Sequence, residues 1–145
     1  MRGSSRLVAF VLLLMSIACT VWPTEQDIKD SLEATLRSVT GDWRGTSTGE
    51  NPIVLEFRLQ EGNNGQVTGT GTMKEARAAS AVPITISGTY RRPVLVLTLS
   101  GLLYEGQQVQ GTVQGEYTSV AGIATNLQLM GLNYSKAVGI LLQEQ

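Results

Sequence analysis

The sequence lacks histidine and has a single cysteine, Cys19, among its 145 residues. Ser-His-Asp and Cys-His mechanisms need an imidazole, and the usual zinc sites need clustered histidine or cysteine ligands. These chemistries are therefore excluded in their common forms. A glycosidase needs two carboxylates that face one cleft, and the alternation described below turns Glu56 and Glu116 outward. We accordingly predict no catalytic residues, no cofactor and no metal.

Basic residues are also scarce for a protein that binds phosphate. The chain has 11 lysines and arginines against 12 aspartates and glutamates. Two of the basic residues, Arg2 and Arg6, belong to a predicted export signal, so the mature chain is mildly acidic. Nucleic-acid binding needs a basic face. We therefore expect no nucleic-acid partner.

Residues 1–18 have the pattern of a signal peptide. Arg2 and Arg6 precede an unbroken apolar run at 7–15, and small residues follow at 16–18. The apolar run is too short for a lasting bilayer span. We predict an exported protein, with a retained N-terminal anchor helix as the alternative.

The tetrapeptide Ser-Ile-Ala-Cys that ends at Cys19 resembles a lipobox, in which the cysteine becomes the lipidated first residue of the mature chain. The pattern prefers leucine three positions before the cysteine, where this chain has Ser16. Lipidation of Cys19 would anchor the protein to a membrane of the cell envelope through a short linker, residues 19–23. Cleavage nearby is the alternative; it would remove Cys19 or leave it as a free thiol, and would give a periplasmic or secreted protein.

Residues 24–40 form the predicted N-terminal helical segment, with the helix itself at about 25–38. Thr24 and Asp27 have the spacing of a capping box. Apolar side chains then recur at every fourth position on one face: Ile28, Leu32 and Leu36. We expect this stripe to pack against the domain that follows, with binding of a partner as the alternative.

From residue 41 onwards the apolar pattern changes to a period of two, which is typical of half-buried antiparallel strands. In residues 108–118, for example, valines, glycines and Tyr117 share one face and polar residues occupy the other. The same alternation predicts eight strands in a domain at 41–145. A tight turn is predicted at 63–65, where the sequence reads Asn-Asn-Gly.

Eight short strands with brief connections predict an all-β fold: a single small antiparallel up-and-down eight-stranded barrel, preceded by one short amphipathic helix. A barrel closes on itself and so removes unpaired sheet edges. Glycines at inward positions favour the barrel over the alternative, a β-sandwich, because they permit the bends that closure needs. The alanine-rich connection at 74–81 is expected to form a helical turn over one mouth. The apolar residues 102–104 either continue a strand or form a contact loop.

A unit of apolar residue, polar residue, glycine and threonine occurs four times, beginning at Trp43, Val67, Ile86 and Val109. With Gly41-Asp42-Trp43 at the start of the first strand, this pattern resembles the calycins, the superfamily of lipocalins, fatty-acid-binding proteins and avidins. The chain is also similar to small, uncharacterised exported bacterial barrel lipoproteins. The resemblance implies a barrel in the cell envelope and supplies no catalytic residue. The later strands lack the tryptophans of avidins, so biotin binding is not expected.

The predicted interior is either full or hollow, because an eight-stranded barrel has just enough room for its own side chains or for one small ligand. Large side chains point inward at five positions, the candidate ligand-lining residues: Trp43, Phe57, Met73, Tyr90 and Tyr117. Inward glycines would leave room beside them: Gly45, Gly69, Gly71, Gly88, Gly111 and Gly115. The sequence leaves the interior volume open.

Three functions are compatible with these features. The first is a non-enzymatic barrel that binds a small apolar ligand in its interior. The second is a structural or inhibitor-like envelope interaction module with a filled core, whose protein partner the sequence does not identify. The third, an enzyme, would need a cavity lined by carboxylates or tyrosines with strongly shifted pKa values. In each case we expect membrane contact only through the N-terminal lipid anchor.

Overall fold

The computed structural model describes residues 22–117 and 122–145. The predicted signal peptide and the candidate lipidation site Cys19 lie outside these residues. The helix and strands are α2, Glu25–Leu36; β1, Gly41–Ser47; β2, Ile53–Glu61; β3, Gln66–Glu75; β4, Val82–Arg91; β5, Val94–Tyr104; β6, Gln107–Glu116; β7, Ile123–Gly131; and β8, Tyr134–Glu144. A short 3₁₀ turn, η1, covers Asn63–Gly65 between β2 and β3.

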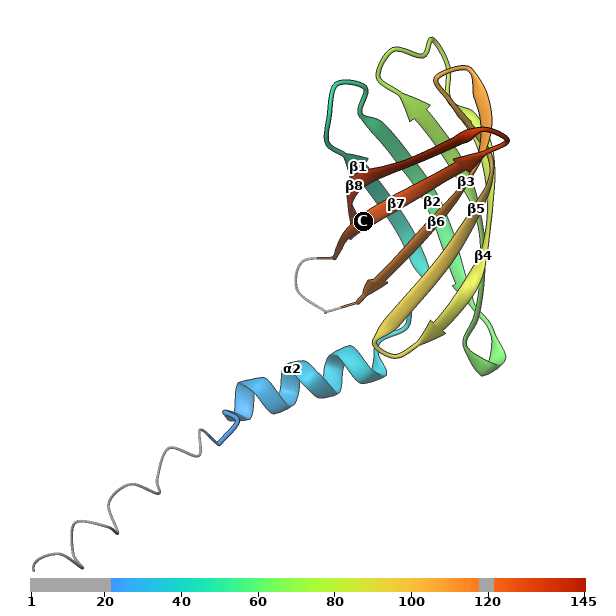
Figure 1. Ribbon diagram of the computed structural model, residues 1–145. Helices are drawn as coiled ribbons and strands as arrows, with labels where there is room; N and C mark the ends of the chain where they lie inside the picture. Colours follow the sequence, from blue (N-terminus) through green and yellow to red (C-terminus); the bar gives the residue numbers. More distant parts are fainter. Residues whose placement is uncertain (1–21, 118–121) are drawn as a thin grey trace, which may run out of the picture.

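The strands form one closed barrel in which each strand pairs with its neighbours in sequence and β8 pairs with β1 (Figure 1). Every pair is antiparallel. This arrangement confirms the predicted up-and-down barrel with one short helix before it, and it excludes the β-sandwich.

Two connections show how local sequence sets the course of the chain. Asn64 and Gly65 have φ angles of 63° and 70°, which asparagine and glycine tolerate best, and they confirm the predicted tight turn. The predicted helical turn at 74–81 is wrong. Lys74 and Glu75 continue the ladder with β2. The rest of the connection has a hydrogen-bonded turn, in which the N–H of Ala78 donates to the carbonyl oxygen of Glu75 at 3.0 Å, and no helix.

The apolar residues 102–104 continue β5. The register between β5 and β6 shifts between Leu99 and Leu102, and this irregularity places both leucines on the inner face, where they are buried. Leu103 points outward and is partly exposed. The strand continuation is therefore confirmed, and no apolar contact loop forms there.

The helix α2 begins with the predicted capping box. The N–H of Thr24 donates to Oδ2 of Asp27 at 2.8 Å, and the N–H of Asp27 donates to Oγ1 of Thr24 at 3.2 Å. The hydrogen bonds from Thr24 hold the pKa of the Asp27 carboxyl below its ordinary value. The helix start is thus confirmed, and the helix ends at Leu36, slightly before the predicted end.

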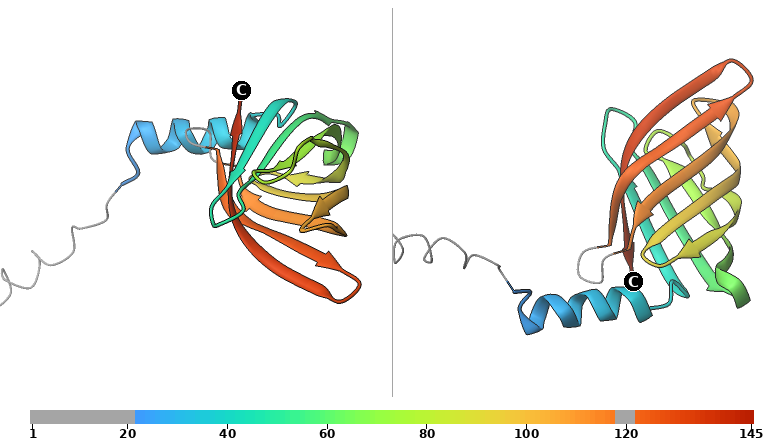
Figure 2. Two further views of the ribbon diagram at one scale, coloured as in Figure 1. Left: turned by 90° about the horizontal axis from the view of Figure 1, so that it is seen from above. Right: turned by 60° about the horizontal axis from the view of Figure 1, so that its bottom comes forward.

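Two apolar side chains of the α2 stripe are not covered by the barrel. Ile28 and Leu32 are 56% and 57% exposed, and Trp22 just before the helix is 82% exposed. Figures 1 and 2 show the helix leading away from one end of the barrel. The prediction that the stripe packs on the domain is wrong for Ile28 and Leu32, because periodicity identifies an apolar face but not what covers it. In the described part of the chain, no helix is long and apolar enough to cross a membrane.

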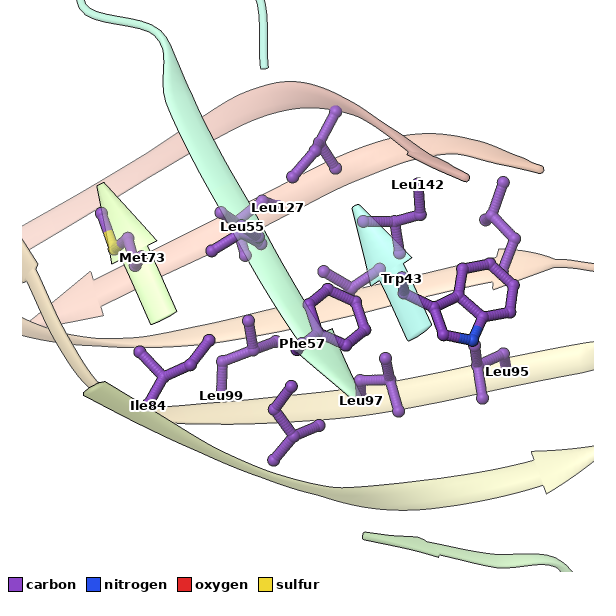
Figure 3. Close-up of a cluster of buried hydrophobic side chains, with 14 of the residues drawn as sticks. Trp43, Leu55, Phe57, Met73, Ile84, Leu95, Leu97, Leu99, Leu127 and Leu142 are labelled. Atoms are coloured by element: carbon purple, nitrogen blue, oxygen red, sulfur yellow. The ribbon is translucent and has the colours of Figure 1, made fainter. Parts of the chain in front are cut away.

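The core lies inside the barrel, where side chains from all eight strands form one cluster. In Figure 3 the labelled side chains point toward one another across the interior. The five candidate residues all belong to this cluster and are buried: Trp43, Phe57, Met73, Tyr90 and Tyr117. Their predicted inward orientation is confirmed, while a ligand-lining role remains a prediction.

Candidate functional site

Neighbouring side chains occupy the space above three of the inward glycines. A Cβ atom at Gly45 would lie 2.7 Å from Cδ2 of Leu142, and one at Gly111 would lie 2.8 Å from Cδ1 of Leu102. Two carbon atoms in contact prefer about 3.5–4.0 Å. A side chain of β7 fills the space at Gly115 in the same way. These glycines therefore make room for their neighbours and not for a ligand.

At the other three inward glycines the adjacent strand itself comes close. A Cβ atom at Gly69, Gly71 or Gly88 would collide with the backbone carbonyl oxygen of Arg58, Glu56 or Val96, respectively. Glycine in a strand permits this close approach of another backbone, as at a tight bend of a barrel. The room that the sequence left open at the inward glycines is thus taken by the protein's own atoms.

The five candidate residues do not converge on one site. Trp43 and Met73 lie on opposite sides of the cluster in Figure 3, with Phe57 between them. Tyr90 and Tyr117 lie instead beside Trp43 at one end of the barrel. The structure therefore brings together three of the five and distributes the other two along the core.

The end of the barrel next to α2, the closed end, is sealed by an aromatic layer. The ring centroids of Trp43 and Tyr117 are 5.2 Å apart and those of Tyr90 and Tyr117 are 6.3 Å apart, both edge to face. The indole Nε1 of Trp43 donates to the carbonyl oxygen of Val39 at 3.0 Å. Since Trp43 is only 2% exposed, this bond gives its buried N–H the partner it needs. The segment between α2 and β1 thus closes this end.

Two arginines cover the tyrosines of the closed end. The guanidinium carbons of Arg37 and Arg92 lie 5.6 and 5.0 Å from the ring centroids of Tyr117 and Tyr90. Each arginine also forms an ion pair with a carboxylate, at 2.6 Å for Arg37 and 2.7 Å for Arg92. The partner of Arg37 is Glu144, whose Oε2 also accepts a hydrogen bond from the Tyr117 hydroxyl at 2.8 Å. The charged and hydroxyl groups of the closed end therefore bind one another, which is typical of contacts that stabilise a fold.

Tyr117 is expected to titrate at high pH. Burial, and then its hydrogen bond to Glu144, raises the pKa of Tyr117 to about 12. An unfolded tyrosine has a pKa of about 10, so the contribution of Tyr117 to stability is present below that pH and is lost as the pH rises to about 12. Ultraviolet difference titration of the protein against its Tyr117→Phe variant isolates this hydroxyl. Ionisation at the ordinary pKa would contradict the buried hydrogen bond.

The opposite end of the barrel, the open rim, contains a groove of about 470 Å³. Its walls come from residues 48–51 of the β1–β2 loop, Arg77 of the β3–β4 connection, Tyr104 and Glu105 at the end of β5, and residues 136–139 of β8. Figure 1 shows these connections at the end of the barrel that lies away from α2. Side chains that are distant in the sequence therefore meet at this groove.

Lys136 is the centre of a polar cluster at the open rim. Its Nζ donates to the hydroxyl of Tyr104 at 3.1 Å and to Oε1 of Glu105 at 3.2 Å, and the Tyr134 hydroxyl donates to Oε2 of Glu105 at 3.3 Å. The bonds to Tyr104 and Glu105 raise the pKa of Lys136, and the bond from Lys136 lowers the pKa of Glu105. Both shifts favour the charged forms at neutral pH, in which Lys136 is a hydrogen-bond donor and Glu105 is an acceptor.

Asn51 contributes a buried oxygen to the same end. Its Nδ2 donates to Oε2 of Glu75, and the other carboxylate oxygen of Glu75 accepts from the N–H of Glu105 at 3.1 Å. Oδ1 of Asn51 is buried and has no hydrogen-bond partner among the described residues. A buried acceptor without a partner costs about 1–3 kcal/mol.

A larger hollow, of about 550 Å³, lies on the outer face of β1, β2 and β3. It is an open depression beside threonines and glycines of the sheet, and its charged residue is Arg58. Arg58 already pairs with Asp42 at 3.0 Å. The open rim is the better candidate site because it combines a groove with a buried acceptor that lacks a partner.

No protein-family model matches this chain, and no curated protein or solved structure matches it. The site is therefore interpreted from its own chemistry. Within residues 22–117 and 122–145, no group of three or more histidine, cysteine, aspartate or glutamate side chains is placed to hold a metal ion. The open rim offers hydrogen-bond donors, hydrogen-bond acceptors and charges of both signs, which are groups suited to binding.

Sequence reasoning did not identify the open rim, because its residues come from separate segments that meet only when the barrel closes. One signal was available. Lys136 precedes Val138, Ile140 and Leu142 at the same spacing of two, so the alternation places a charged residue at an inward position. A charge at such a position indicates the mouth of a barrel or a functional group.

Proposed function

We propose that this protein is an exported, non-enzymatic barrel with a filled core that acts as an interaction module through its open rim. The observation that carries the proposal is the occupation of the inward glycine positions by neighbouring side chains and backbone. A ligand of lipocalin type needs a pocket of about 300 Å³ or more, and this packing does not favour one. Of the functions left open by the sequence, the filled interaction module has the stronger support.

The position of the helix supports the open rim as the acting end. α2 leaves the barrel at the closed end (Figure 1), and Cys19 precedes the helix in the sequence. With lipid on Cys19, the closed end faces the membrane, the 12-residue helix adds a spacer of about 18 Å, and the open rim faces the aqueous compartment. Mass spectrometry of the mature N-terminus tests this tether: diacylglycerol on Cys19 is expected, and an unmodified start elsewhere refutes it.

Kinship with the calycins and with exported bacterial barrel lipoproteins is part of the same proposal. It is supported by the closed eight-stranded topology and by Gly41-Asp42-Trp43 at the start of β1. In this proposal the barrel keeps the calycin architecture and uses the interior as a packed core. Binding of a small apolar ligand inside the barrel is the competing function.

The proposal is tested with apolar probes that report on the interior. In a Trp22→Phe variant, Trp43 is the only tryptophan, so its fluorescence is read without the exposed Trp22. We expect neither a fluorescent fatty acid nor iodobenzene, a small apolar quencher, to change Trp43 emission saturably up to about 100 μM.

A cavity variant shows that the assay detects binding. Leu95 is buried and lies beside Trp43 in Figure 3. Leu95→Ala in the same background should open a dry apolar cavity of the kind that accepts benzene-sized molecules, and iodobenzene should then quench Trp43. Saturable binding of either probe to the protein with Leu95 intact would overturn the filled-core proposal and restore the apolar-ligand function.

A further inference from the structure

We infer that the open rim binds an extended peptide segment of a partner protein, which pairs with β8 as an added strand. This inference rests on the proposed function and deepens it, because it names the class of partner that the rim takes.

The first observation is a free stretch of strand edge on β8. β8 pairs with β7 from Tyr134 to Leu142 but with β1 only from Ile140 onwards. The last bond on the β1 side runs from the N–H of Thr48 to the carbonyl oxygen of Gly139, at 3.1 Å. Residues 134–138 therefore have no strand partner on the β1 side within the described chain.

The direction of the backbone groups follows from the ladder. In an antiparallel pair, alternate residues direct both their N–H and C=O groups to the same neighbouring strand. Because Gly139 faces β1, Ser135 and Ala137 face the same side, whereas Lys136 and Val138 face β7. The N–H and C=O groups of Ser135 and Ala137 thus form an unpaired edge, which is a template for strand addition.

The second observation is that part of this edge, at Ala137, lines the groove of the open rim. Residues 136–139 line the groove together with residues 48–51 of the β1–β2 loop. In Figure 1 the β1–β2 loop and the tip of the β7–β8 hairpin diverge. Apart from its two chain neighbours, no atom lies within 4 Å of a Cβ position at Gly49, so the β1–β2 loop is open at this residue.

The charges of the groove favour a neutral backbone as the ligand. Glu105 is neutralised by Lys136 at 3.2 Å, and the remaining charged residues in the walls, Glu50 and Arg77, have opposite signs. The groove therefore has no net charge to attract a phosphate or an anionic lipid headgroup.

A second copy of this chain fits the groove less well than a free peptide. In a second barrel, the same β8 edge is flanked by that barrel's own β1–β2 loop. If two such edges paired antiparallel, the loop of residues 48–51 in each barrel would lie against the β7–β8 hairpin of the other barrel before the strands could pair in full. An extended segment that is not part of a sheet meets no such obstacle.

Lys136 makes the edge selective and does not block it. Inward-pointing charges are one means by which proteins prevent edges from pairing indiscriminately. Here the ammonium group points into the mouth and is held by Tyr104 and Glu105. It does not extend across the hydrogen-bonding groups of Ser135 and Ala137.

Amide-resolved nuclear magnetic resonance of the purified protein tests the inference. The probe is the capped pentapeptide acetyl-Thr-Val-Thr-Val-Thr-amide, whose backbone supplies the required donors and acceptors. Up to about 5 mM peptide should cause saturable shift changes centred on Ser135, Ala137 and Gly139, and should slow exchange of the Ala137 amide by about tenfold or more. The same peptide with every amide N-methylated should have no effect.

A pair of variants separates the backbone from the side chain. Ala137→Pro removes an N–H that has no partner in the described chain, a position where an edge strand tolerates proline, and should weaken peptide binding by about tenfold or more. Ala137→Val keeps the N–H and should bind within about twofold of the unsubstituted protein.

Three results would overturn the inference. They are absence of peptide binding at the rim, equal binding of the N-methylated peptide, and protection of the Ala137 amide by self-association of the protein without peptide. Failure of the proposed function is measured separately. It would be detected as binding of an apolar probe beside Trp43, whereas peptide binding is detected at the amides of β8.

Discussion

Replacing Gly111 by leucine is expected to lower the free energy of unfolding by about 2–3 kcal/mol. A Cβ atom there would already lie 2.8 Å from Cδ1 of Leu102 and 3.0 Å from Cδ1 of Leu127, so the whole leucine side chain has to displace both. In a hollow barrel the same leucine would fill empty space and leave the free energy of unfolding unchanged or higher. Urea-induced unfolding, followed by circular dichroism, measures the difference.

Gly62→Leu is the matched control for this substitution. Gly62 is exposed, has an extended backbone with φ −96° and ψ −171°, and a Cβ atom there would lie 3.7 Å from the nearest atom. Its substitution should change the free energy of unfolding by no more than about 0.5 kcal/mol. Equal stability of the Gly111 and Gly62 variants would mean that the interior is not filled at Gly111.

Truncation of Trp43 to alanine is expected to cost about 3–5 kcal/mol of unfolding free energy. The variant loses the edge-to-face contact with Tyr117 and the hydrogen bond to Val39, and it opens the closed end. Trp43→Phe keeps an aromatic ring and loses the indole N–H, so it should cost less, about 1–2 kcal/mol. Chemical denaturation of the two variants measures both values.

The other tryptophan supplies the control for Trp43. Trp22 is 82% exposed, so Trp22→Ala should leave the free energy of unfolding within about 0.5 kcal/mol of the unsubstituted protein. A cost for Trp43→Ala that is no greater than the cost for Trp22→Ala would contradict the closure of the barrel by Trp43.

The fold was predictable because alternation of apolar and polar residues determines which face of a strand is buried. Leu55 and Phe57 on β2, for example, follow this rule without exception in the structure. The same rule covers only part of β8. Its buried apolar positions begin at Val138, but the strand starts at Tyr134, because the polar residues of this first part lie at the rim where water is within reach.

Two features of the site were not predictable from the sequence. A glycine such as Gly71 can either leave a void in the interior or allow a neighbouring backbone to come close. The sequence does not distinguish these two outcomes, because they depend on the strand register, which pairs Gly71 with Phe57. The free edge of β8 was hidden by the expectation that a closed barrel has no edges. It arises because β1 ends at Ser47, whereas β8 begins at Tyr134, before Ile140, the first of its residues that pairs with β1.

The proposal of a filled interior is tested most directly by a crystal structure under xenon pressure, because xenon enters empty apolar cavities in proteins. We expect no ordered xenon in the cluster around Trp43, Phe57 and Leu127, and we expect a xenon site in the same experiment on Leu95→Ala. Xenon bound inside the unsubstituted barrel would contradict the filled core and, with it, the proposal that this protein acts through its rim.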